Sequence, residues 1–438
     1  MEALGIAGAT FALLVLYLGL GTWIFVALMM VSVSALVLLL DMPINRVGAI
    51  MMGTMWRTAS TWELAAVPIF IVMGEIVFRS DISERLFRGL SPWVDPIPGR
   101  LLHCNVGGCT LFAAVSGSST ATTATIGKIT GSALAQRGYD VRLSIGSLAG
   151  AGSLGLMIPP SISMIIYGVL AEESIAHLFA AGVFPGLLIT GLYSAYIIVR
   201  CMMDPSKSPD DGVKYGWGDR LRGLLDLFPI LLLIGIVLGG IYTGLVTPSE
   251  AAVLGFVASL AVTALLKQLT WKIFIDSLLG ATRITCMVIT ILVAASFMSS
   301  AMGYLHVPQE IAKGIAYLDL GPVGLIILLG VFYVILGLFL DGLSIMVMTL
   351  PITLPLIGAA GYDAVWFGVF LVIMVELGLV TPPIGFNLFV LQGLTGQKMS
   401  LIARAAFPFF VLMGVAAIVV TVFPEIALWL PRVLFGGG

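Results

Sequence analysis

Long apolar stretches divide the chain into segments with the length of transmembrane helices, since about 20 apolar residues cross a bilayer. We expect full spans at residues 4–21, 24–41, 64–78, 178–199, 226–244, 249–266, 285–302 and 405–430. Amphipathic stretches at residues 41–61 and 272–284 predict helices that lie along the membrane surface. The pattern predicts an all-α polytopic membrane protein.

Two further apolar segments, residues 141–170 and 364–390, each contain adjacent prolines near the middle, at Pro159-Pro160 and Pro382-Pro383. Proline lacks a backbone N–H and clashes with the preceding turn, so a continuous helix is broken there. In lipid, freed backbone groups are tolerated only where they are buried in protein or line a cavity. We expect two discontinuous helices whose ends face an ion or solute. A simple proline kink is the alternative.

The two breaks belong to an internal repeat with an offset of 223 residues, since 382 − 159 = 223. The same offset relates Gly138-Tyr139-Asp140 to Gly361-Tyr362-Asp363 and Phe184-Pro185 to Phe407-Pro408. We assign a first repeat to residues 1–203, a linker to 204–223 and a second repeat to 224–438. Each repeat has five spans, and an odd number of crossings predicts that the repeats are inverted, as in secondary transporters.

A stretch rich in small and polar residues precedes each break, at about residues 100–136 and 322–358. The centre of the first is Ser116-Gly117-Ser118-Ser119, and the centre of the second is Asp341-Gly342-Leu343-Ser344. The offset aligns them, because 118 + 223 = 341. Their short apolar arms predict one re-entrant hairpin per repeat, with its tip at mid-membrane. A helix that uses Ser, Thr and Gly for close packing is the alternative.

Composition and charge agree with a membrane protein. Only 10% of the residues are charged, against about 25% in soluble domains. No basic patch suits a nucleic-acid backbone. The four cysteines lack metal-ligand or redox spacing and are interpreted as small apolar residues. Most basic residues fall on one predicted side, in residues 79–100, 137–142, 200–222, 267–272 and 398–404, which predicts that this side is cytoplasmic and that both termini are outside.

The hairpin tips carry the candidate chemistry. Each tip should meet the broken helix of its own repeat, and hydroxyl, carboxylate and freed carbonyl oxygens suit Na⁺. The residues of the first expected Na⁺ site are Ser116, Gly117, Ser118, Ser119, Gly155, Ile158 and Pro159. Those of the second are Asp341, Gly342, Ser344, Gly378, Thr381 and Pro382.

We expect the carboxylate of a solute between the two tips, near the membrane midplane. A helix begins beyond each tip, and its free N–H groups favour an anion. The expected substrate-binding residues are Ser119, Thr120, Thr123 and Asn387.

Three charged residues in apolar surroundings have alternative interpretations. Asp341 is a functional acid by default if it lies inside the membrane, and an interfacial acid otherwise. Glu376 ties the broken helix to the hairpin, carries protons or makes a purely structural hydrogen bond. Lys128 either neutralises an acidic solute or extends toward the cytoplasmic surface.

Other function classes lack support in the sequence. Ser116-Gly117-Ser118 resembles a nucleophile turn, but no triad partners accompany it. The chain contains no H-E-x-x-H and no nucleotide-binding G-x-x-x-x-G-K-[ST] motif. A channel is disfavoured, because the sequence has two complete repeats with hairpins and no run of pore-lining charge.

Four motifs resemble a known family. They look like motifs of the large, DctM-type membrane subunit of tripartite ATP-independent periplasmic (TRAP) transporters. The four motifs are SGSSTATTATIG (116–127), GLMIPPS (155–161), GVFPG (182–186) and GLVTPPIGFNLFV (378–390). The resemblance covers essentially the whole chain.

This resemblance implies Na⁺-coupled import of organic acid anions, such as C4-dicarboxylates or sialic acid, across the bacterial inner membrane by an elevator mechanism, with periplasmic termini. It implies two partners: a small four-helix, DctQ-type membrane subunit on a separate chain and a DctP-type periplasmic solute-binding protein. It also implies Na⁺ where the tips face the broken helices. The alternative is a one-component Na⁺/dicarboxylate symporter.

Overall fold

The structure, a computed structural model, describes residues 2–210, 212–213, 215–306, 321–338, 340–382 and 385–436. These residues form α-helices and short 3₁₀ turns, without a strand. Six of the described helices are long and apolar enough to cross a membrane, and a seventh span results if the bent pair Ile44–Ala59 and Trp62–Arg79 is counted as one. The predicted all-α membrane architecture is confirmed.

The elements follow one another in nearly the same order in the two halves of the chain. The first half contains α1 (Glu2–Gly19), α2 (Ile24–Leu38), α3 (Ile44–Ala59), η1 (Trp62–Ala65), α4 (Ala66–Arg79), α5 (Ile82–Val94), α6 (Leu102–Ser116), α7 (Ser119–Gln136), α8 (Val141–Gly152), η2 (Ser153–Leu156), α9 (Ile162–Ala171), α10 (Ile175–Met203) and η3 (Pro205–Lys207). The second contains α11 (Trp217–Tyr242), α12 (Pro248–Leu265), α13 (Trp271–Tyr304), α15 (Pro322–Gly337), α16 (Gly342–Ala359), α17 (Ala364–Leu379), α18 (Phe386–Thr395), α19 (Met399–Val422) and α20 (Glu425–Phe435). Helix α7 begins 223 residues before α16, and α8 begins 223 residues before α17.

Two predicted boundaries are wrong. The surface arm at 272–284 and the span at 285–302 form one continuous helix, α13. In the first half, α3 instead ends at Ala59 and the 3₁₀ turn η1 begins at Trp62. The last predicted span, 405–430, is two helices, because α19 ends at Val422 and Pro424 precedes α20.

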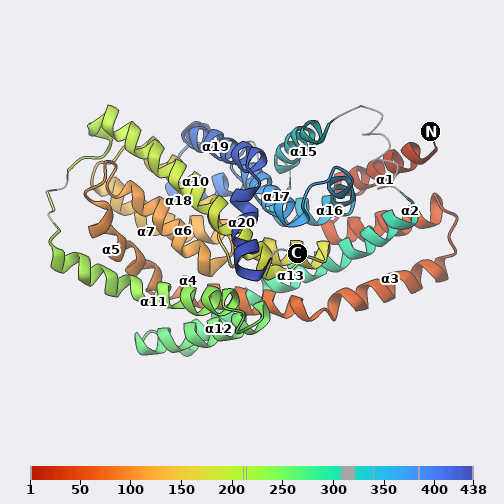
Figure 1. The fold of residues 1–438 in the computed structure, drawn as a ribbon, viewed down its shortest axis with the longest axis horizontal. Coiled ribbons are helices and arrows are strands. Elements are labelled where there is room, and N and C mark those ends of the chain that lie inside the picture. Colours follow the sequence, from red (N-terminus) through yellow and green to blue (C-terminus); the bar gives the residue numbers. More distant parts are fainter. Residues whose placement is uncertain are drawn as a thin grey trace.

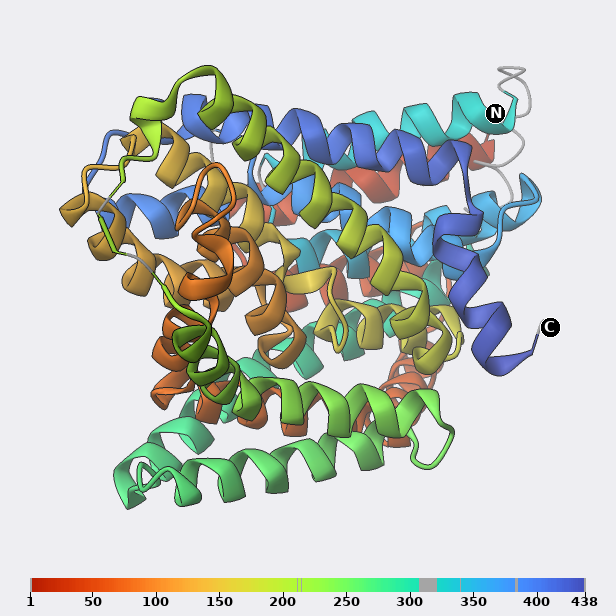
Figure 2. The same ribbon diagram turned by 60° about the vertical axis from the view of Figure 1, so that its left-hand side comes forward.

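Helix α17 forms the centre of the molecule (Figure 1). All of its residues from Val365 to Leu379 are buried, and it packs against α9, α10, α15, α16 and α19. Helices α11 and α12 instead form an outer pair that packs against α5 and α4 (Figure 2). The core therefore lies around one of the two broken helices.

The predicted cytoplasmic segments lie at one end of the long helices. Arg100 forms an ion pair with Asp210 of the linker, and the Asp140 N–H donates to the Lys207 carbonyl at 3.1 Å. Gln268 forms two hydrogen bonds with Asp81. Figure 2 shows the linker at the end of the molecule opposite to both termini.

This arrangement makes a prediction about sidedness. Helix α11 has 26 residues and is therefore about 39 Å long, which places the exposed Ser206 and Leu245 at opposite membrane faces. We expect Ser206→Cys to label with an impermeant thiol reagent only from the cytoplasmic side, and Leu245→Cys only from outside. The measurement uses sealed, oriented vesicles and a variant without the four native cysteines. Labelling of both positions from one side contradicts the topology.

Candidate ion and solute site

The first hairpin turns back at the predicted tip. Helix α6 ends at Ser116, Gly117 adopts a left-handed conformation with φ 58°, and the extended Ser118 caps α7 by accepting from the Ala121 N–H at 3.4 Å. Helices α6 and α7 pack against each other. Because only Gly117 and Ser118 separate these two helices, the chain doubles back here.

The first tip contacts the first break directly. A Cβ atom on Gly155 would lie 2.5 Å from backbone atoms of Ser118 and Ser119, and one on Gly117 would lie 3.1 Å from the Pro160 carbonyl oxygen. Beyond the break, Ser161 caps α9 by accepting from the Met164 N–H. The structure therefore brings together the residues of the first expected Na⁺ site, 116–119 and 155–159.

The second tip contacts the second broken helix. The Asp341 carboxylate caps α16, accepting from the Ser344 N–H at 3.2 Å and from the Ser344 hydroxyl. A Cβ atom on Gly342 would lie 2.4 Å from Val375 Cγ1 of α17. Asp341, Gly342 and Ser344 thus lie beside α17, with both carboxylate oxygens of Asp341 already engaged in the cap.

The glycines of the second half make a similar backbone contact. A Cβ atom on Gly378 would lie 2.6 Å from the Cα atom of Gly337, at the end of α15. Thr381 and Pro382 follow α17, and the Thr381 hydroxyl donates to the Leu377 carbonyl at 2.6 Å. Pro383, the second proline of the expected break, lies outside the described residues.

Glu376 links the two halves. This residue of α17 is 1% exposed, and its Oε1 accepts from the Ser119 hydroxyl and, at 3.0 Å, from the Leu156 N–H. Of the alternatives drawn from sequence, the structure shows a tie to a hairpin, but to the hairpin of the other half. Among the described groups, none bonds to Oε2. The pairing with Leu156 left no signal in the sequence beyond an isolated acid in an apolar segment.

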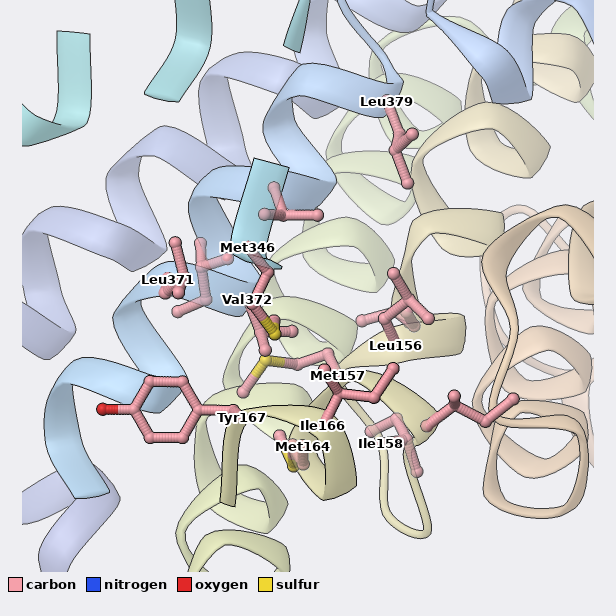
Figure 3. Close-up of a cluster of buried hydrophobic side chains, with 14 of the residues drawn as sticks. Leu156, Met157, Ile158, Met164, Ile166, Tyr167, Met346, Leu371, Val372 and Leu379 are labelled. Atoms are coloured by element: carbon pink, nitrogen blue, oxygen red, sulfur yellow. The ribbon is translucent and has the colours of Figure 1, made fainter. Parts of the chain in front are cut away.

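Apolar side chains surround this link. Leu156, Met157 and Ile158 from the first break form one cluster with Met346 of α16 and Val372 of α17 (Figure 3). The cluster closes the break to water, which strengthens the hydrogen bonds inside it. The Ile158 side chain is buried and apolar, so only its carbonyl oxygen is suited to bind an ion.

The expected substrate residues divide into bonded and unbonded groups. Ser119 is engaged with Glu376, and the hydroxyls of Thr120 and Ser118 are 3.2 Å apart. Thr123 and Asn387 are fully buried, and the Thr123 hydroxyl and both amide atoms of Asn387 lack hydrogen-bond partners among the described residues. They belong to α7 and α18, which pack together. Buried polar groups without partners are costly, which makes these two suited to a solute.

Paired tips and broken helices in a helical membrane protein are typical of the class of membrane transporters. The fold is similar to that of a solved structure of the Alcanivorax borkumensis YdaH transporter, with a TM-score of 0.65, 12% identity and 90% coverage of both chains.

The profile described as "Tripartite ATP-independent periplasmic transporter, DctM component" matches residues 11–426. The C4-dicarboxylate TRAP transporter large permease protein DctM of Pseudomonas aeruginosa is 33% identical, covering 86% of this chain and 88% of the relative. The isethionate TRAP transporter permease protein DctMQ of Oleidesulfovibrio alaskensis is 32% identical, covering 96% of this chain and 65% of the relative. The chain therefore spans about two thirds of this longer relative.

The chain belongs to the DctM component family of tripartite ATP-independent periplasmic transporters. This is a family of transporter permeases and not of enzymes, and the resemblance drawn from the four sequence motifs is confirmed.

The contact at Gly155 predicts a steric effect. We expect Gly155→Ala to lower the thermal midpoint of the purified protein, because its Cβ would meet tip backbone at 2.5 Å, and overpacking costs about 1–3 kcal/mol. Gly107→Ala, in the hairpin that Gly155 contacts, is the control, since its Cβ would meet only Leu90 side-chain atoms at 3.7 Å or more. Equal melting of the two variants would show that the tip does not rest on Gly155.

The link at Glu376 predicts a second loss of stability. Glu376→Ala leaves the buried N–H of Leu156 without its acceptor, at a cost of about 1–3 kcal/mol, whereas Glu376→Gln retains an acceptor and should melt closer to the wild type. The control is Glu75→Ala, which removes a helix-surface pair with Arg79. The thermal midpoint in detergent is the measurement, and an equal effect of Glu376→Ala and Glu75→Ala argues against the link.

Proposed function

We propose that this chain is the large permease subunit of a Na⁺-coupled importer of organic acid anions in a bacterial inner membrane. The observation that carries the proposal is the contact of each tip with the broken helix of its own half, at Gly155 in the first half and between Gly342 and Val375 in the second, together with the buried and unpartnered groups of Thr123 and Asn387. The names of the relatives, which specify a C4-dicarboxylate and isethionate, support small organic anions as the solute class.

The residues present suit Na⁺. The two tips and the first break offer hard oxygen donors of the kind found at Na⁺ sites in broken helices. These donors are the hydroxyls of Ser116 and Ser118, the freed carbonyls near Ile158 and the Asp341 carboxylate. Ions at the two tips would place positive charge beside a solute carboxylate, and the N-termini of α7 and α16 would add to it. Ion and solute would then bind cooperatively, each tightening the other by the same factor.

The transport cycle that we propose is an elevator. The 223-residue offset between helix starts supports a duplication, and an odd number of crossings in each repeat would make the two copies inverted. The hairpins and broken helices move as one block, because α17 is buried among α9, α15 and α16, while α11, α12 and α13 belong to the scaffold. The proposed partners are a DctQ-type small membrane subunit on a separate chain and a DctP-type periplasmic binding protein.

The proposed ion sites predict a Na⁺ requirement. In proteoliposomes that contain this chain, the small subunit and the loaded binding protein, solute uptake should stop when choline replaces Na⁺. Ser118→Ala and Asp341→Ala should each raise the half-saturating Na⁺ concentration several-fold, because each removes an oxygen ligand. Thr243→Ala, at the exposed end of the outer helix α11, is the control and should leave this concentration unchanged. Uptake that proceeds equally well in choline overturns Na⁺ coupling.

The same assay separates the proposal from a one-component Na⁺/dicarboxylate symporter. In the proposed system this chain alone supports no uptake, and activity requires co-reconstitution with the small subunit and the loaded binding protein. Full Na⁺-driven uptake by the chain alone would establish the symporter instead.

A further inference from the structure

A cavity lies away from the tips, at the linker end of the molecule. It has a volume of about 390 Å³ and lies between α7, α8 and α18, with Asn105 of α6 at one wall. The turn that follows α7 is held at the linker end by the bond from Asp140 to Lys207. The cavity therefore lies near the predicted cytoplasmic face.

Its lining combines one positive charge with an apolar wall. Lys128 is the only charged residue among the described residues that line it, and Leu134, Ile145, Leu148 and Leu394 supply the apolar surface. Within the described chain, no carboxylate lies within ion-pairing distance of the Lys128 ammonium. A lysine ammonium beside apolar side chains suits an organic anion, whose carbon skeleton can pack against the apolar wall, better than it suits an inorganic anion.

Buried polar atoms in the same lining lack partners. Asn105 is 0% exposed, and its amide nitrogen is bonded to the Ser144 carbonyl and the Ser147 hydroxyl. Its Oδ1, like the Ser144 hydroxyl, has no hydrogen-bond partner among the described residues. Buried polar atoms are normally satisfied, so these two indicate a ligand with hydrogen-bonding groups.

The cavity lies along helix α7, which begins at the first tip. Thr123, Gly127 and Gly131 are spaced four residues apart on α7 and therefore share one face. Gly127 and Gly131 line the cavity. A Cβ atom on Gly127 would meet only the side-chain ends of Leu148 and Leu394, at 2.8 and 3.0 Å.

We propose that this cavity binds a small organic anion through Lys128, Asn105 and Ser144, as a release site on the cytoplasmic side. The inference rests on the proposed import function and adds a second binding position for the same solute class. An anion leaving the tips along α7 would pair with Lys128 before it enters the cytoplasm.

The test uses the purified full chain without Na⁺, so its result does not depend on Na⁺ coupling. Gln397, which lines the cavity, is replaced by cysteine in a variant without the native cysteines. Labelling rates are compared for methanethiosulfonates that carry either a sulfonate or a trimethylammonium group. Lys128→Met should lower the sulfonate-to-ammonium rate ratio at least about fivefold, Lys128→Arg should preserve it, and Lys267→Met, a matched change at the same end but outside the cavity, should leave it unchanged.

The class of ligand is identified by which added anions protect the cysteine at position 397 from labelling. Succinate or isethionate should slow labelling of Gln397→Cys when Lys128 is present and not in Lys128→Met. Inorganic phosphate and phosphatidylglycerol vesicles are the comparison arms. An unchanged rate ratio in Lys128→Met, absence of protection by both organic anions, or protection by phosphate or lipid alone would each overturn the proposal. If the complete reconstituted system showed no Na⁺-driven uptake while the organic anions still protected Gln397→Cys from labelling, only the proposed import function would be overturned.

Discussion

The hydrogen bonds of the Glu376 carboxylate hold the centre of this structure together. The first broken helix exposes backbone groups inside a protein that sits in lipid, where water does not compensate them. Glu376 bonds to one of these groups, the N–H of Leu156, and at the same oxygen to the hydroxyl of Ser119 at the hairpin tip. A single side chain from the second half therefore fixes both parts of the site in the first half. Removing one partner of such a buried bond costs more than the bond itself contributes, because the remaining group stays unsatisfied.

Close backbone contact is the second constraint, and glycine is the residue that permits it. Gly155 lies against the first tip, and Gly378 lies against Gly337 in the second half. At each contact a methyl group would occupy space that backbone atoms already fill. The two tips differ in chemistry: a serine caps the helix of the first and an aspartate caps that of the second. The difference gives one tip a neutral oxygen and the other a carboxylate.

The distribution of charge follows from the same arrangement. Among the described residues, Glu376 is the only carboxylate that is buried. Other charged side chains form ion pairs, such as Arg100 with Asp210 of the linker and Arg85 of α5 with Asp226 of α11. Lys128 stands outside these pairs, on the wall of a cavity and close to unpartnered polar atoms. Its position suits recognition better than structural support.

The sequence by itself determined the family, the 223-residue offset, both helix breaks and both tips, because proline, glycine and capping side chains act on the backbone within a few residues. Glu376 also stood out as an acid in an apolar segment. Its partner Ser119, 257 residues away, became visible only in the tertiary structure, because contacts across that separation depend on how helices pack. The continuity of α13, the engagement of Asp341 with Ser344 and the cavity beside Lys128 were likewise visible only in the structure. Local rules thus placed the elements, and packing selected which of their polar groups are bonded and which remain free for ligands.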